Sequence, residues 1–389
     1  MPRPSLFDRL AEQHAERARR SLVRRLRVVE AADGAYVTLG GKRLLNFASN
    51  DYLGLAQHPA VRDALIGAAL QWGVGATAAP LLGGRRDEHA ALEDALARWT
   101  GRERALLFTD GWAANLGTIA ALIGHDDVCV EDKLNHASLI DATRLAGCEL
   151  KRFRHADVDG ARRQLESTPG PVAMVATDGV FSMDGDIAPL VDLAALCRAE
   201  QATLMVDDAH GLGVLGPEGA GSVAEASLTQ DDVPILMATL GKALGVAGAF
   251  VAGSAALIDA LVQDARTFVY ATATPPALAS AARAAVDVAR FEGWRRDRLA
   301  RVIAHFRGAA AARGLALLPS RTPIQPLIIG ASDDALAVAA KLEDAGFYVP
   351  AIRPPTVADG AARLRIALTA LHSGNDVERL VDAVARALA

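Results

Sequence analysis

Short apolar runs alternate along the middle of the chain with segments whose apolar residues recur at helical spacing. This pattern predicts strands at 104–109, 128–131, 172–177, 203–206 and 233–238, and helices at 89–99, 112–123, 137–146 and 190–200. Strands and helices that alternate in this way form right-handed crossovers in a largely parallel sheet. The nearly continuous apolar runs at 172–177 and 203–206 fit a sheet covered on both faces. We therefore expect an α/β domain.

The two ends of the chain have different patterns. Four leucines between residues 6 and 26 stand at near-helical spacing among arginines, which predicts an amphipathic arm over 6–28, followed by a glycine-turned hairpin over 35–47. After residue 276 the pattern predicts helices at 277–313, 334–345 and 376–388 and strands at 324–330, 348–352 and 363–368. We expect a helical arm and hairpin at 1–49, a large α/β domain at 50–280 and a small α+β domain at 281–389.

Composition narrows the class of protein. The 389 residues include 41 basic and 46 acidic side chains, and the net charge of −5 does not favour nucleic acid or an anionic membrane surface. Cys129, Cys148 and Cys197 are odd in number and lie in apolar runs, which indicates reduced thiols and a cytoplasmic location. We expect no secretory signal and no transmembrane segment, because apolar runs are interrupted by charges or helix breakers.

The stretch MATLGKALGVAG at 237–248 places Lys242 among apolar and glycine residues, directly after a predicted buried strand. An amine in such surroundings is poorly solvated, which disfavours the ammonium form and lowers the lysine pKa. A lysine of this kind suits Schiff-base formation. A surface lysine in a glycine-rich turn is the alternative. A phosphate-loop lysine is not indicated, because Ala243 follows it instead of serine or threonine.

Two further segments follow predicted strands, where ligands bind in parallel sheets. TDGWAAN at 109–115 joins a strand to a helix, and the N–H groups at the helix start would suit a phosphate; an ordinary strand–helix turn is the alternative. Asp207 and Asp208 end another strand, and His210 comes three residues after Asp207. Asp207 could pair with a cationic ring nitrogen and His210 could donate to a neighbouring oxygen. A metal site, or plain polar residues at a strand end, are the alternatives.

Two more segments carry polar groups. NHAS at 135–138 begins a helix, and its His136 is either a functional ring or the neighbour of a helix cap. DGVFSMDG at 178–185 combines glycines with hydroxyl and carboxylate groups, although turn chemistry alone would explain it. Together, the groups match the needs of pyridoxal 5′-phosphate (PLP). This cofactor requires a helix terminus and hydroxyls for its phosphate, a carboxylate for its pyridine nitrogen, a lysine for its aldehyde and a ring partner.

The order of these motifs resembles that of the α-oxoamine synthases, which are PLP-dependent acyltransferases of fold type I. The matching blocks are NFASNDYLGL at 46–55, GWAAN at 111–115, NHASLIDA at 135–142, GVFSMDGD at 179–186, MVDDAHGLGVLG at 205–216, TLGKALG at 239–245 and AIRPPTV at 351–357. The resemblance runs from about residue 24 to the C-terminus. It implies a large, mostly parallel-sheet domain, a smaller C-terminal α+β domain and an N-terminal arm.

The resemblance also implies roles for individual residues. The catalytic candidates are Lys242, Asp207, His136 and His210. At the cofactor, it assigns the Schiff base and the movement of the substrate Cα proton to Lys242, the pyridine nitrogen to Asp207, the ring face to His136, the phenolic side to His210 and Ser182, and the phosphate to Gly111, Trp112 and Thr239. The substrate-binding candidates are Arg24, Asn50, His136, Arg353 and Thr356, of which Asn50, Arg353 and Thr356 are expected to hold the amino-acid carboxylate.

The family also implies an assembly. Tyr270 and Thr272 lie in a segment that approaches the partner subunit's site, so a homodimer with interfacial active sites is expected and Thr272 is a cofactor-binding candidate. No metal is expected. Two departures from the family pattern stand out. Asp178 occupies a position where glutamate is frequent, and residues 73–84 are more apolar than the serine-rich glycine loop that the family leads us to expect.

The implied reaction is a decarboxylative condensation of an amino acid with an acyl thioester. AIRPPTV, together with IQPLIIG at 324–330, favours the branch that joins L-alanine to a pimeloyl thioester in biotin biosynthesis and releases CO2 and the free carrier. The carrier is either CoA or an acyl carrier protein. The alternatives are a glycine C-acetyltransferase, which joins glycine to acetyl-CoA, and a non-catalytic partner subunit.

Overall fold

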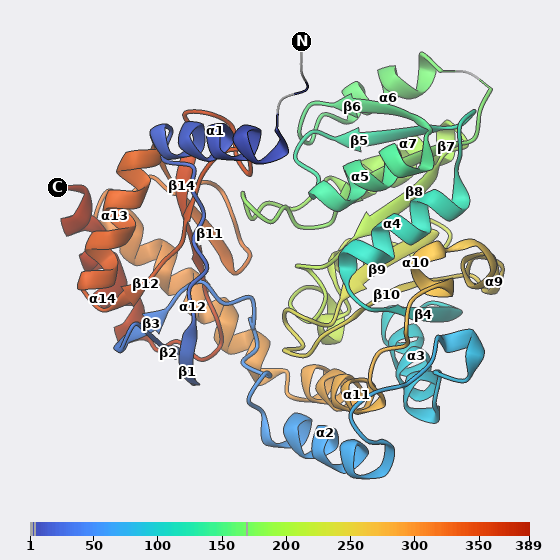
Figure 1. Ribbon diagram of the computed structural model, residues 1–389, viewed down its shortest axis with the longest axis horizontal. Helices are drawn as coiled ribbons and strands as arrows, with labels where there is room; N and C mark the ends of the chain where they lie inside the picture. Colours follow the sequence, from blue (N-terminus) through green and yellow to red (C-terminus); the bar gives the residue numbers. More distant parts are fainter. Residues whose placement is uncertain (1–2, 4, 169) are drawn as a thin grey trace. The chain divides into compact units, whose positions relative to one another are not determined.

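The computed structural model describes residue 3, residues 5–168 and residues 170–389. The chain forms two compact units, each of which is described by itself, and Figure 1 shows their elements coloured along the chain. The large unit contains residues 50–182 and 186–298, and the small unit contains residues 1–49, 183–185 and 299–389. No helix in the described part of the chain is long and apolar enough to cross a membrane.

The large unit is built on a seven-stranded sheet with the order β4-β10-β9-β8-β7-β5-β6. Its strands are β4 (Arg104–Phe108), β5 (Val128–Asp132), β6 (Glu149–Phe153), β7 (Ala173–Asp178), β8 (Thr203–Asp207), β9 (Ile235–Thr239) and β10 (Ala249–Gly253). Neighbours from β6 to β9 pair in parallel, whereas β10 is antiparallel to β4 and β9. The expected largely parallel α/β sheet is therefore confirmed. β10 runs antiparallel to β9 because the connection between them, residues 240–248, is too short for a parallel crossover.

Helices cover both faces of this sheet (Figure 1). One face packs against α4 (Gly111–Leu122), α5 (Ala137–Ala146), α9 (Ala255–Asp264) and α10 (Arg266–Val269). The other face packs against α6 (Val158–Glu166), α7 (Leu190–Ala199) and α8 (Ser222–Glu225). Side chains that alternate along each strand enter the two cores in turn: Met174 and Ala176 face the first core, and Val175 faces the second. Burial on both faces explains why the inner strands, such as β7 and β8, have no polar face.

The helices α2 (Pro59–Trp72), α3 (Asp87–Thr100) and α11 (Pro276–Phe291) complete the large unit, together with the short 3-10 helices at Pro80–Leu82 and Pro217–Gly219. α11 packs against both α2 and α3. Its buried face is rich in alanine, at residues 277, 279, 281, 282, 285 and 289, and small side chains let helices approach closely. The large unit therefore continues to residue 298, past the limit at 280 that we expected from the sequence.

The small unit holds two sheets. The first contains β1 (Val29–Asp33), β2 (Tyr36–Leu39), β3 (Lys42–Asn46) and β12 (Phe347–Tyr348), and the second contains β11 (Ile324–Gly330), β14 (Ala362–Ala367) and β13 (Ala351–Ile352). Its helices are α13 (Ser332–Asp344), α14 (Gly374–Leu388) and most of α12 (Trp294–Ala312). β12 pairs in parallel with β3, so the N-terminal hairpin belongs to the same compact unit as the C-terminal residues.

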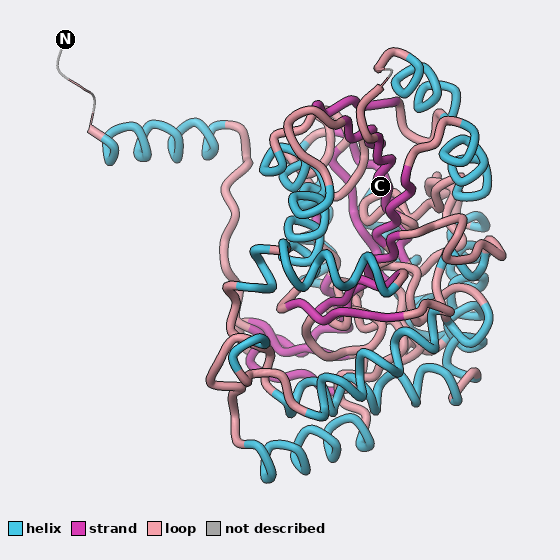
Figure 2. The backbone as a smooth tube through the Cα atoms, turned by 90° about the vertical axis from the view of Figure 1, so that its right-hand side faces the viewer, coloured by secondary structure: helices cyan, strands magenta, loops and turns pink. Residues whose placement is uncertain are grey.

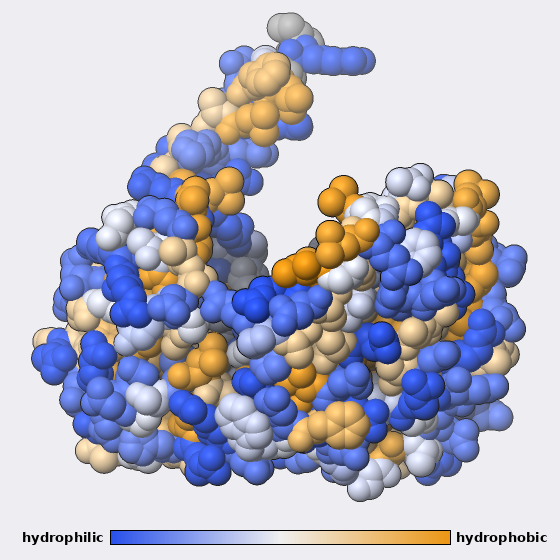
Figure 3. All heavy atoms as spheres, turned by 90° about the horizontal axis from the view of Figure 1, so that it is seen from below, coloured by the Kyte–Doolittle hydropathy of each residue, from blue (hydrophilic) through white to orange (hydrophobic). Residues whose placement is uncertain are grey.

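The N-terminal helix α1 (Leu6–Arg19) is shorter than the arm predicted over 6–28. Ser21 has a positive φ of 53°, and the guanidinium of Arg353 donates to the carbonyl groups of Ser21 and Val23. These contacts hold the chain after α1 in a non-helical path. α1 has no buried residue. Figure 2 shows it projecting beside the N-terminal label, and Figure 3 shows apolar and polar side chains exposed together on this segment.

Four parallel strands of the large sheet end in polar residues at the same edge. β5 ends at Asp132, β7 at Asp178, β8 at Asp207 and β9 at Thr239. Asp178 and Asp207 are direct partners in the register of β7 and β8. Since the carboxyl ends of parallel strands meet at one edge, the sheet alone brings these groups together.

A partly buried ion cluster holds the loop that follows β7. His155 Nε2 lies 2.8 Å from the Asp186 carboxylate, and His155 Nδ1 lies 3.1 Å from that of Asp132. The His155 ring also packs edge-on against Phe181, with 4.4 Å between ring centroids. Burial lowers the pKa of His155, but the two carboxylates outweigh it and raise that pKa to about 10. His155 is therefore a cation at neutral pH that ties the loop to the end of β5.

We expect His155→Gln to lower the free energy of unfolding by on the order of 3 kcal/mol at pH 6.5. The folded-state pKa of His155 lies above the unfolded value. Its contribution is therefore complete below about pH 6.5 and is lost as pH rises through 10. Urea unfolding of both proteins between pH 6 and 10 should show their difference shrinking with pH. The control is His125→Gln, since His125 is an exposed histidine beside Asp126. A difference between wild type and His155→Gln that does not change with pH would contradict this account of the cluster.

Candidate active site

Lys242 lies in the glycine-rich connection after β9, and its side chain is half-buried. Its Nζ is 2.9 Å from Nε2 of His210, which is a buried histidine in the turn after β8. The lysine loop is closed by a hydrogen bond from the N–H of Gly245 to the carbonyl of Lys242. The structure thus brings together two of the predicted catalytic residues, an amine and an imidazole.

The other ring nitrogen of His210 has a partner from a distant part of the chain. The hydroxyl of Tyr52 lies 2.7 Å from His210 Nδ1 and donates to the side-chain oxygen of Asn50 at 3.1 Å. Tyr52 is completely buried. Asn50, a predicted substrate residue, is therefore connected to Lys242 through Tyr52 and His210.

Asp207 is held by two donors at the end of β8. Asn115 Nδ2 donates to Asp207 Oδ2 at 2.8 Å, and the N–H of Ala209 donates to Asp207 Oδ1 at 3.0 Å. Asn115 Nδ2 also lies 2.8 Å from Ser138 Oγ, which in turn is 2.7 Å from Nδ1 of His136. A second hydrogen-bonded chain therefore connects Asp207 with His136.

His136 is the N-cap residue of α5, and its ring meets Trp112 edge-on with centroids 6.0 Å apart. Partial desolvation and the positive charge of Lys242 lower the pKa of His136, while Asp207 acts in the opposite direction. The imidazole is therefore neutral at neutral pH. The structure places His136 at the N-cap of α5, with Asp207 and Lys242 near enough to act on its pKa, and a functional role of the ring stays a prediction.

Asp178 is a buried carboxyl group next to Asp207. Its Oδ2 accepts the N–H of His136 at 3.1 Å, and its Oδ1 has no hydrogen-bond partner among the described residues. Burial and the adjacent Asp207 carboxylate raise the pKa of Asp178 well above its usual range. The reason is that two like charges at this spacing disfavour each other, which makes ionisation of Asp178 unfavourable.

The three predicted phosphate-binding residues lie at the start of α4 and at the end of β9. Gly111 is the first residue of α4, and the side chain of Asp110 caps the helix by accepting the N–H of Ala113 at 2.8 Å. The ring of Trp112 is 43% exposed. Thr239 ends β9, and its hydroxyl donates to the carbonyl of Gly248 at 3.0 Å. A helix N-terminus and a hydroxyl group are suitable donors for an anionic group.

Asp208 points away from this site. Its carboxylate accepts the N–H and the hydroxyl of Ser222 at 2.7 and 2.6 Å, and burial raises its pKa to about 7. A Cβ at Gly211 or Gly221 would lie 2.0 Å from the carboxylate of Asp208. Asp207 and Asp208 therefore do not converge on one ligand, which argues against the metal alternative. Within the described residues, no group of three or more possible metal-binding side chains occurs.

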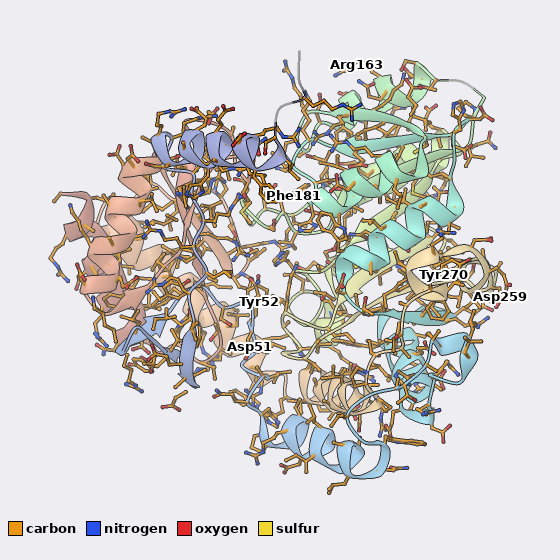
Figure 4. All side chains as sticks on the ribbon, viewed as in Figure 1. Asp51, Tyr52, Arg163, Phe181, Asp259 and Tyr270 are labelled. Atoms are coloured by element: carbon orange, nitrogen blue, oxygen red, sulfur yellow. The ribbon has the colours of Figure 1, made fainter. Side chains whose placement is uncertain are left out.

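The remaining predicted residues are less closely connected. Ser182 is half-buried in the loop after β7, and Thr272 is exposed after α10. Tyr270 is 71% exposed at the end of α10, where Figure 4 labels it. Thr272 and Thr109 line one small cavity of the large unit.

Three predicted substrate residues lie in the small unit. Arg24 Nη2 is 3.4 Å from Thr356 Oγ1, and both side chains are exposed. Arg353 donates to the carbonyl groups of Ser21 and Val23. Burial lowers the pKa of Arg353, and the neighbouring Arg24 lowers it further. Arg24, Arg353 and Thr356 therefore lie within the small unit, whereas the predicted substrate residues Asn50 and His136 belong to the large unit.

Sequence reasoning missed Asn115, Ser138 and Tyr52 as members of the site. All three stand inside blocks that carried the family resemblance, but no local pattern distinguished them. Asn115 and Tyr52 meet partners that are 92 and 158 residues away in the chain. The usable signal was position alone: Asn115 lies one turn into the helix that follows β4, and Tyr52 lies two residues after Asn50.

These residues fit the chemistry of PLP. The large unit provides an amine at Lys242, a carboxylate anchored by two donors at Asp207, a neutral ring at His136 and a helix N-terminus at Gly111. PLP carries an aldehyde, a basic ring nitrogen, an aromatic face and a phosphate, which are the four complements of those groups.

Comparison with known proteins gives the same picture. The family model described as Aminotransferase class I and II matches residues 42–384. An 8-amino-7-oxononanoate synthase of Alkalilimnicola ehrlichii is 51% identical, over 99% of this chain and 98% of that protein.

Two solved structures are similar over most of their length. A serine palmitoyltransferase from S. paucimobilis, with a bound PLP–myriocin aldimine, has a TM-score of 0.94 at 27% identity. The match covers 99% of this chain and 98% of that protein. An 8-amino-7-oxononanoate synthase from Francisella tularensis has a TM-score of 0.78 at 28% identity. The match covers 89% of this chain and 98% of that protein. The chain therefore belongs to the class I and II aminotransferase family and, within it, to the 8-amino-7-oxononanoate synthases.

Proposed function

We propose that this chain is a PLP-dependent acyltransferase that condenses L-alanine with a pimeloyl thioester and forms 8-amino-7-oxononanoate in biotin biosynthesis. The reaction releases CO2 and the thiol of the carrier, which is CoA or an acyl carrier protein. One observation carries the proposal: Lys242, His210, Asp207 and His136 lie in one unit of a chain that matches an 8-amino-7-oxononanoate synthase over nearly its whole length.

PLP supplies, when bound, an electrophilic aldehyde and a conjugated ring that accepts electron density. Lys242 is assigned the aldehyde, Asp207 the ring nitrogen and His136 the ring face. His210 and Ser182 are assigned the phenolic oxygen, and the phosphate is assigned to Gly111, Trp112 and Thr239, with Thr272 as a further cofactor-binding candidate. The hydrogen bonds from Asn115 and Ala209 to Asp207 support this assignment, because they orient a carboxylate that is 5% exposed.

On the substrate side, we assign the alanine carboxylate to Asn50, Arg353 and Thr356, and a further substrate contact to Arg24. The guanidinium of Arg353 can bind a carboxylate in a bidentate manner. Lys242 is assigned the transfer of the substrate Cα proton. The neighbouring Nε2 of His210, at 2.9 Å, supports this role because it offers a partner for a proton on Nζ.

We propose a homodimer with active sites at its interface. Large apolar side chains of the large unit support it, since they stand exposed along residues 66–82, at 112 and at 270: Ile66, Leu70, Val74, Leu81, Leu82, Trp112 and Tyr270. An exposed apolar surface of this kind marks an interaction site in soluble proteins. It also gives a reason for the apolar character of the 73–84 loop. A cytoplasmic location is proposed from the three free, buried cysteines.

Asp207→Asn should lower kcat by about 100-fold or more, while thermal unfolding stays close to that of the wild type. The substitution keeps the size of the side chain but removes the charge that faces the ring nitrogen. Steady-state rates and circular dichroism melting test this expectation. Asp259→Asn on the surface of α9, labelled in Figure 4, is the matched control. An Asp207→Asn variant with the wild-type rate would contradict the role assigned to Asp207.

Borohydride reduction of the chain saturated with PLP should attach the cofactor covalently to Lys242. Hydride converts the carbon–nitrogen double bond of a Schiff base into a stable amine, which peptide mass spectrometry detects. Lys341→Arg, at a surface lysine of α13, should label like the wild type, and Lys242→Arg should not label. An unlabelled wild type at saturation would favour a non-catalytic partner subunit.

The decisive test of the reaction is an assay with paired substrates. We expect product from L-alanine with a pimeloyl thioester, offered both on CoA and on an acyl carrier protein, and little product from glycine with acetyl-CoA. The two amino acids differ by one methyl group, which is worth only about 1–3 kcal/mol of discrimination, so the acyl group should provide most of the preference. A strict preference for glycine with acetyl-CoA would identify a glycine C-acetyltransferase instead.

A further inference from the structure

Tyr52 is a buried tyrosine that connects to the proposed Schiff-base lysine through a single histidine. It lies between β3 and α2, where Figure 4 labels it, and its side chain is 0% exposed. Its hydroxyl donates to Asn50 Oδ1 at 3.1 Å and lies 2.7 Å from His210 Nδ1, while His210 Nε2 lies 2.9 Å from Lys242 Nζ. Each distance is within hydrogen-bonding range.

The turn that carries Tyr52 is fixed against the lysine loop. The Asp51 carboxylate accepts two backbone N–H groups of this turn, at 2.7 and 3.1 Å. Gly245, three residues after Lys242, has a φ of +67°, and a Cβ on it would lie 2.3 Å from the backbone nitrogen of Ala56. The two segments are therefore in direct backbone contact, which leaves the Tyr52 hydroxyl little freedom to move away from His210.

Asn50, at the end of the hydrogen-bonded series that runs from Lys242 through His210 and Tyr52, determines which atoms of Tyr52 and His210 carry hydrogen. The side-chain oxygen of Asn50 can only accept, so Tyr52 donates its single hydrogen to Asn50. The Tyr52 oxygen can then accept from His210, which places the hydrogen of the neutral imidazole on Nδ1. His210 Nε2 consequently carries a lone pair and faces the Nζ of Lys242.

We propose that Tyr52 is a positioning residue that holds His210 in the Nδ1–H tautomer, so that His210 Nε2 accepts a proton from the Lys242 ammonium when this lysine binds its aldehyde. One N–H bond breaks at Lys242 and one forms at Nε2. The resulting imidazolium still donates through Nδ1 to Tyr52. Lys242 is left as the neutral amine that nucleophilic attack requires.

The alternative is that Tyr52 only fills the core with its ring and that its hydroxyl has no effect on His210. Tyr52→Phe separates the two roles, because it keeps the ring in the core and removes only the oxygen that faces His210 Nδ1. Tyr36→Phe is the matched control. Tyr36 lies in β2 of the small unit, where its ring packs under the guanidinium of Arg43 at 3.7 Å.

The first measurement observes the tautomer directly. Long-range 1H–15N spectra of the full chain, labelled with 15N-histidine and freed of PLP, distinguish Nδ1–H from Nε2–H, and His210→Gln identifies the signals of His210. We expect Nδ1–H in the wild type and in Tyr36→Phe, and a shift towards Nε2–H in Tyr52→Phe. A wild-type His210 that carries its hydrogen on Nε2 would overturn the proposal without the need for any Tyr52 variant.

The second measurement follows the reactivity of Lys242. After PLP is mixed with the PLP-free chain, the rate at which Schiff-base absorbance appears should fall about tenfold or more in Tyr52→Phe and stay unchanged in Tyr36→Phe. A wild-type rate in Tyr52→Phe, or an equal loss in Tyr36→Phe, would overturn the proposal. This step rests on the proposed function, since it takes PLP as the aldehyde. If the wild type forms no Schiff base, the proposed function fails, and the tautomer measurement still decides the role of Tyr52.

Discussion

The register between β7 and β8 places two carboxyl groups side by side in the interior, and most of the site depends on how this pair shares its charge. Asp178 and Asp207 are direct partners at the ends of these strands. Ionising both in a buried setting is unfavourable, and burial together with the adjacent Asp207 raises the pKa of Asp178. Asp207 receives two hydrogen bonds, from Asn115 and Ala209, whereas Asp178 receives one and leaves an oxygen without a partner.

The same pair organises the groups around it. Asn115 bridges Asp207 to Ser138, which reaches His136, and Asp178 accepts the N–H of His136. Lys242 and His210 form a hydrogen-bonded network with Tyr52 and Asn50. A carboxyl group, an imidazole ring and an amine are thereby held by hydrogen bonds, and groups held in place need little reorganisation during a reaction.

Periodicity predicted β4, β5, β7, β8 and β9 and the helices α3, α4, α5 and α7, because buried strands and amphipathic helices have strong local patterns. It missed β6, β10, α2, α6 and α9, and β10 is a fully buried strand inside the sheet. β6 is an edge strand with half-exposed polar residues, and α2 buries only Val61 and Ala68.

The limits of the units and the inner members of the site were harder to predict. The alanine-rich face of α11 indicates close helix packing but does not identify the helices it packs against. These are α2 and α3, which lie far away in the sequence. In the same way, the motifs located Lys242, Asp207 and His210 at strand ends, whereas Tyr52 and Asn115 act through contacts between distant segments. Local pattern carries no information on such contacts.

The packing around Asp208 changes how the glycines of the DDAHGLG segment should be understood. The carboxylate of Asp208 occupies the volume that a Cβ at Gly211 or Gly221 would need, and a Cβ at Gly179, directly after β7, would collide with the same carboxylate and with its partner Ser222. These glycines are therefore required by a buried acidic side chain and its serine. A motif search that treats closely spaced glycines after a strand as a nucleotide-binding signature would misclassify this stretch, because here the missing side chains make room for protein atoms and leave no space for a phosphate.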